Sequence, residues 1–97
     1  MIDRIKTTKA PEALGTYSQG SKIGGLIFTS GQIGINPTTG ILVDESFEDE
    51  VLQVLNNVSA VLEAGGSNIN HLVKVTVFIK DLNNFTSVNN VFSGFFN

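Results

Sequence analysis

The segment from Ser46 to Gly66 constrains the fold most, because it carries the start, body and end signals of one amphipathic helix. Ser46 and Asp49 stand at capping-box spacing, and three consecutive acidic residues suit the positive end of a helix dipole. Gly65 and Gly66 are typical of a helix C-terminus. Between these ends the apolar residues recur at steps of three and four, as one stripe: Phe47, Val51, Val54, Leu55, Val58, Val61 and Leu62.

Strand-type segments lie on both sides of this helix. Residues 2–7 are expected to form a short first strand, and residues 17–23 and 26–30 two more. The Gly24-Gly25 pair between the last two predicts a hairpin with a type I′ turn, because glycine accepts positive φ angles. Apolar and polar residues alternate from Val73 to Lys80, which predicts a fourth strand buried on one face.

A second helix is predicted after Asp81, which can act as its N-cap. Its apolar stripe would consist of Phe85, Val88, Phe92 and either Phe95 or Phe96. The expected order is therefore β-β-β-α-β-α, an α+β fold with one sheet and both helices packed on one face. The 97 residues suffice for a single domain spanning 1–97.

Composition argues against several classes of function. The net charge of −3 provides no basic face for nucleic acid, and the lack of cysteine excludes disulfides and thiolate chemistry. No apolar run is long enough to span a membrane, so a cytoplasmic protein is expected. His71 is the sole histidine, which makes a poor metal site, and Gly31-Gln32-Ile33-Gly34 lacks the Lys-Ser/Thr of a phosphate loop. Neither a metal nor a cofactor is expected.

Two stretches place hydroxyl groups beside glycine, at residues 15–20 (GTYSQG) and 28–33 (FTSGQI). Together they resemble the Rid family of reactive-intermediate deaminases, also called the YjgF family. The resemblance continues through Asn57-Val58, residues 73–78, residues 80–82 and Val88-Asn89. It implies a chorismate-mutase-like fold, a homotrimer and hydrolysis of small 2-imino or enamino acids to 2-oxo acids and ammonia. Older names for the family are endoribonuclease and translation initiation inhibitor.

The resemblance also implies that Tyr17, Ser30, Gly31 and Asn89 bind the substrate. From the residues alone, the sequence favours Tyr17 as a strand aromatic lying half on the core. By the same reasoning Ser30-Gly31 is typical of an ordinary turn, and Asn89 of an exposed helix residue. A serine hydroxyl and an unhindered glycine N–H at one strand end do suit a carboxylate. Ser30 is expected to bind and not to attack, because no neighbouring base is evident. Family members commonly have proline where Thr16 stands. The threonine here is expected to loosen the approach to Tyr17 without removing its hydroxyl.

Family members also continue past the matched region into two further strands, which carry an arginine and a glutamate thought central to the chemistry. The chain is therefore expected to lack the C-terminal part of the family pattern, as a fragment or a natural short form, and its catalytic residues stay unassigned. The alternative to an imine deaminase is a non-catalytic member that binds small carboxylates and acts through partners.

Overall fold

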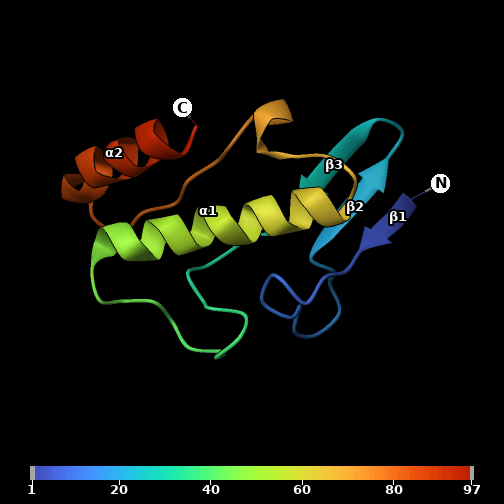
Figure 1. The fold of residues 1–97 in the computed structure, drawn as a ribbon, viewed down its shortest axis with the longest axis horizontal. Coiled ribbons are helices and arrows are strands. Elements are labelled where there is room, and N and C mark those ends of the chain that lie inside the picture. The colour runs from blue at the N-terminus through green and yellow to red at the C-terminus, as the bar shows by residue number, and fades with distance from the viewer. Residues whose placement is uncertain (1, 97) are drawn as a thin grey trace.

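The computed structural model describes residues 2–96, and within them the strands form one antiparallel sheet in the order β1-β2-β3. The strands are β1 (Ile2–Ile5), β2 (Gly20–Ile23) and β3 (Leu26–Thr29). The α-helices are α1 (Phe47–Ala64) and α2 (Phe85–Phe95), and two 3-10 turns are η1 (Ile69–His71) and η2 (Leu82–Asn84). Figure 1 shows α1 crossing beside the sheet and α2 lying along α1 at the end away from the strands. The expected α+β class is confirmed.

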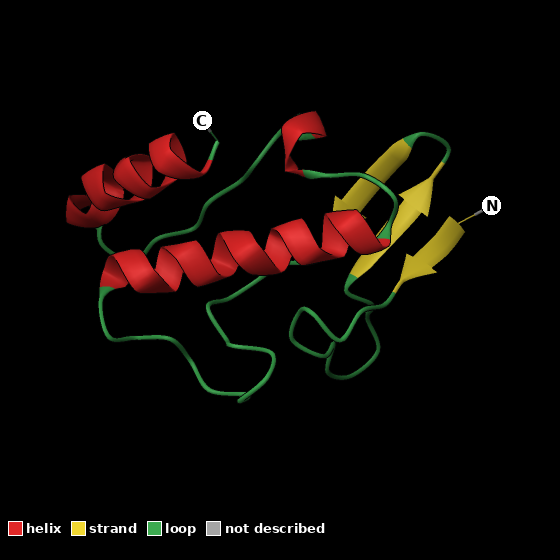
Figure 2. Cartoon of the chain, in the orientation of Figure 1, coloured by secondary structure: helices red, strands yellow, loops and turns green. Residues whose placement is uncertain are grey.

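The β2–β3 hairpin forms at the predicted two-residue connection, with Ile23 paired to Leu26. The predicted type I′ turn is wrong, because among the two glycines only Gly24 has a positive φ, of 57°. A left-handed first position alone is the pattern of a type II′ turn, which also matches the twist of the flanking strands. The strands are shorter than expected, and Figure 2 shows a long loop between β1 and β2. Thr7 and Tyr17 lie in this loop.

Helix α1 begins and ends as its local signals predict. The Ser46 hydroxyl accepts a hydrogen bond from the Asp49 N–H at 3.0 Å, which satisfies one of the free donors of the first turn. At the other end the Gly65 N–H donates to the Val61 carbonyl at 3.1 Å, and Gly66 takes a φ of 90°. A left-handed residue after the cap is the usual way a helix stops, and glycine adopts it without strain.

The core lies between the sheet and the C-terminal half of α1. Ile5, Ala10 and Val61 are buried together, with Ile27 and Ala60 packed against them. Two glycines allow the close approach that this packing requires. A Cβ on Gly20 would lie 2.8 Å from Val61 Cγ1, and one on Gly65 would lie 2.7 Å from Ile5 Cδ1.

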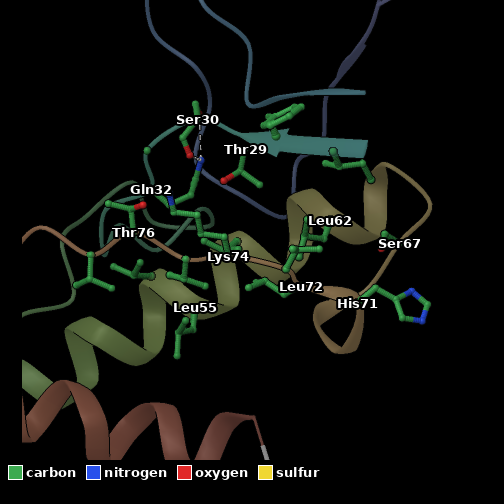
Figure 3. A pocket seen from close by; sticks show the side chains of 18 of the residues that line it. Thr29, Ser30, Gln32, Leu55, Leu62, Ser67, His71, Leu72, Lys74 and Thr76 are labelled. Carbon is green, nitrogen blue, oxygen red and sulfur yellow. Dashed lines mark hydrogen bonds between the residues drawn. The ribbon is translucent and has the colours of Figure 1, made fainter. Parts of the chain in front are cut away.

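Residues 72–80 differ from the expectation. They run past α1 without strand pairing. The face expected to be buried is open, since Val73, Val75 and Val77 are 91%, 39% and 45% exposed, so that the predicted one-sided burial is wrong. The reason is the absence of a neighbouring backbone. A groove of about 1200 Å³, lined by residues of β3, α1 and this segment, separates the segment from β3 (Figure 3). Alternation in sequence favours an extended chain, but a strand needs a partner.

The second helix begins later than expected. Asp81 does cap a turn, since its carboxylate accepts from the Asn83 N–H at 2.9 Å, but that turn is the 3-10 turn η2. Helix α2 follows directly, with Val88 buried on its inner face. No helix within residues 2–96 is both long and apolar enough to cross a membrane.

Candidate functional site

A buried glutamine organises the loop that carries Tyr17. Gln19 is 4% exposed, and its side-chain nitrogen reaches the carbonyl oxygens of Thr7, Ala10 and Pro11 at 3.0, 3.1 and 2.7 Å. Its side-chain oxygen accepts from the Thr7 N–H at 2.7 Å. No role for Gln19 is predicted from the sequence, since a single polar residue beside a strand belongs to no recognisable motif. In the structure its side chain makes hydrogen bonds to the backbone of residues 7–11, which is not paired in a strand.

Ser30 joins the end of β3 to the start of β2. Its backbone N–H and its hydroxyl both donate to the Gln19 carbonyl, at 2.9 and 3.1 Å. The Gln32 side chain donates to the Ser30 hydroxyl at 3.2 Å. The hydroxyl therefore already uses its one proton, and it would have to leave the Gln19 carbonyl to donate to a ligand.

Gly31 is the open part of this strand end. It is exposed, it has no positive φ, and a Cβ built on it would meet no atom within 4 Å. Within residues 2–96 the N–H groups of Gly31 and Gln32 have no hydrogen-bond acceptor. Neither backbone strain nor crowding therefore explains a glycine here, whereas close approach by a ligand would.

Two hollows meet at Ser30. The smaller, of about 370 Å³, is lined by Tyr17 and Ser30, and the larger is the groove next to β3, which Ser30 and Gly31 line. The volume of the smaller hollow suits a small metabolite. Figure 3 shows Thr29, Ser30 and Gln32 on one side of the groove, with Lys74 and Thr76 facing them from the extended segment.

Arg4 also lines the smaller hollow, together with Thr16, Ser18 and Ser21. Arg4 was not predicted as a site residue, because it lies in the expected first strand and matches no site position of the family. Pairing of Arg4 with Ser21 across β1 and β2 brings it there. Among the described residues that line this hollow, none is acidic and none is histidine, so the surroundings favour an anion.

Asn89 is not brought to this site within one chain. It is exposed on α2 and lines neither hollow, although its neighbour Val88 is buried and lines the groove. The role of Asn89 in binding stays a prediction. His71 lies in the turn η1 at the far end of the groove (Figure 3), and residues 2–96 hold no group of three His, Cys, Asp or Glu residues that could ligate a metal.

The geometry therefore offers neutral donors and one guanidinium around a small hollow, an arrangement that suits a carboxylate or a developing oxyanion. Tyr17 and Ser30 line the smaller hollow, and Ser30 and Gly31 line the groove, so that Ser30 lies between the other two residues. Tyr17 itself is 60% exposed, so its ring forms a rim of the hollow and not part of the core.

The chain matches one family model and is similar to several known proteins. The model of the family described as endoribonuclease L-PSP matches residues 7–97. The 2-iminobutanoate/2-iminopropanoate deaminase of Salmonella typhimurium is 45% identical over 96 residues, which cover 99% of this chain and 74% of that protein. A RutC family protein of Aquifex aeolicus is 47% identical over 92 residues, which cover 95% of this chain and 73% of that protein.

Solved structures of similar proteins have the same fold as this chain. The yjgF gene product of E. coli superposes with a TM-score of 0.93 at 45% identity, covering 97% of this chain and 73% of that one. E. coli TdcF with bound serine gives a TM-score of 0.93 at 41% identity, with the same coverage of 97% and 73%. The chain belongs to the endoribonuclease L-PSP family, which is the YjgF or Rid family that its glycine and hydroxyl motifs resemble.

Proposed function

We propose that this chain carries the substrate-binding corner of a hydrolase that converts small 2-imino or enamino acids to 2-oxo acids and ammonia. The observation that supports this most is the open Ser30-Gly31 strand end, in a chain 45% identical to a relative named for that reaction. The Gly31 N–H is the proposed carboxylate donor, with Ser30 and Tyr17 beside it. The imine carbon would then lie near Ser30, where the groove and the smaller hollow meet.

The reaction requires little of the protein apart from positioning. Water adds its oxygen to the imine carbon and gives one proton to the nitrogen, which forms a carbinolamine. The carbinolamine hydroxyl then gives up its proton to the nitrogen as the carbon–nitrogen bond breaks, which leaves a 2-oxo acid and ammonia. Holding the carboxylate fixes that carbon relative to the water, which is the part that Gly31, Ser30 and Tyr17 would supply. Water activation needs a base, which the described lining of the smaller hollow does not contain.

A second candidate is a binder of small carboxylates without turnover. It is supported by TdcF, a relative 41% identical whose structure holds serine, an amino acid with a carboxylate. The two candidates share the binding step and differ only in hydrolysis.

Binding is tested by titrating the chain with 2-oxobutanoate and following amide resonances by NMR. Ser30→Ala is expected to weaken binding roughly two- to tenfold, the value of one hydrogen bond, while the backbone bond from Ser30 to Gln19 keeps the strand end in place. Ser93→Ala, on an exposed part of α2, is the matched control and should leave affinity unchanged. An affinity unchanged by Ser30→Ala would show that Ser30 is a turn residue with no role in binding.

We further propose that the chain is cytoplasmic and assembles as a homotrimer. Apolar side chains on the sheet face opposite the core support assembly. Ile2, Leu26 and Phe28 are 60%, 56% and 59% exposed there, and covering such a face stabilises an oligomer. Light scattering at micromolar concentration is expected to give three times the chain mass, and a monomer mass would contradict the assembly.

A further inference from the structure

Asn57 is a polar side chain in the middle of the apolar stripe of α1, and it is fully buried at 0% exposure. Its side-chain nitrogen donates to the carbonyl oxygens of Ile33 and Ile35, both at 2.9 Å. Its side-chain oxygen accepts from the Gln53 side chain at 2.9 Å. Both amide protons are therefore used on one loop, which lies more than twenty residues away in sequence.

The same loop contacts α1 at a second point, two turns earlier. Gly34 is buried against the helix, and a Cβ there would lie 2.7 Å from Glu50 Cγ and 2.9 Å from the Glu50 carbonyl. The Gly34 carbonyl accepts from the Val43 N–H at 2.7 Å. Residues 33–35 are thus held by packing and by hydrogen bonds together.

The other end of this segment is fixed by Ser30, through its two hydrogen bonds to the Gln19 carbonyl. Between the two anchors lie Gly31 and Gln32, whose N–H groups have no acceptor within residues 2–96. A short peptide held at both ends keeps its free donors in one orientation, so that a ligand does not have to order them on binding.

We propose that Asn57 is a positioning residue: it holds residues 33–35 so that the Gly31 N–H points at the carboxylate of the bound acid. This rests on the proposed function, since it takes the Gly31 strand end as the carboxylate site. Asn57 touches no substrate and acts through the loop alone. An apolar residue at this place would fit the stripe of α1 but would leave the Ile35 carbonyl oxygen without its donor and the Ile33 carbonyl oxygen with the Ile35 N–H alone.

The test compares Asn57→Ala with the matched control Gln53→Ala. The control removes the third hydrogen bond of Asn57 and leaves both bonds to the loop. Each variant is titrated with 2-oxobutanoate by NMR, and its unfolding in urea is measured separately. Asn57→Ala is expected to lose at least about tenfold in affinity under conditions where it is still folded, and to move the Gly31 amide resonance. Gln53→Ala should keep the affinity and the resonance of the parent chain.

A folded Asn57→Ala chain with the parent affinity and an unmoved Gly31 amide overturns the proposal. Should Asn57→Ala fail to fold, Asn57→Ser keeps one donor and is expected to show the same two changes at smaller size, and their absence counts equally against the proposal. Gly31→Val separates this inference from the proposed function. If Gly31→Val binds as the parent does, the site is wrong, and if only Gly31→Val weakens binding, Asn57 is structural alone.

Discussion

Imine hydrolysis by the 97-residue chain is expected to be at least about a hundredfold slower than by a chimera that adds a C-terminal segment of a relative. The added part is the segment that follows the matched 96 residues in the E. coli 2-iminobutanoate/2-iminopropanoate deaminase, of which this chain covers 74%. By the family resemblance, that segment carries an arginine and a glutamate. A positioned general acid–base group contributes roughly 10²–10⁴ in rate, and the described lining of the smaller hollow contains no such group.

The measurement is release of ammonia or 2-oxo acid from freshly generated imine, corrected for its spontaneous hydrolysis. A chimera with glutamine in place of the added glutamate serves as the control, because it restores the extra strands without the base. Equal turnover by the short chain and the chimera would contradict the mechanism. Binding without turnover in both would favour the carboxylate-binding candidate.

Gly20→Val is expected to lower the free energy of unfolding by about 1–3 kcal/mol, because it overpacks the contact between β2 and α1. The new Cβ would lie 2.8 Å from Val61 Cγ1 and 3.1 Å from the Phe28 carbonyl oxygen. Val61 is 0% exposed and branched at Cβ, so it has no free rotamer into which to move. Urea denaturation followed by circular dichroism measures the change.

Gly25→Ala is the matched substitution in the same hairpin. Its Cβ would meet nothing within 4 Å, and its φ is not in the left-handed region, so its effect on the free energy of unfolding should be close to zero. Similar losses in both variants would contradict packing on Val61 as the cause of the loss at Gly20.

The candidate site could be predicted from the sequence only where a short motif indicates it. Ser30 and Gly31 were found because a hydroxyl and a glycine stand together at a strand end, and Tyr17 because the family motif includes it. Gln19 and Asn57 were missed as site residues, since one buried amide looks like any other polar residue until its partners are known. Arg4 was set aside because it matches no site position of the family, and only strand pairing shows that it lies near Ser21.

Local signals alone determined the bounds of α1, because the Ser46 cap and the Gly65-Gly66 stop act on backbone groups within one helical turn. They also determined the β2–β3 connection, since two glycines between apolar segments leave few other turns. Whether an extended segment pairs with a neighbouring strand was decided by the tertiary structure. Residues 72–80 have the alternation of a strand, yet the groove beside β3 leaves their backbone without a neighbour. The placement of Asn89 away from Ser30 was likewise decided by how α2 packs on α1, because a contact between distant segments depends on the path of the whole chain.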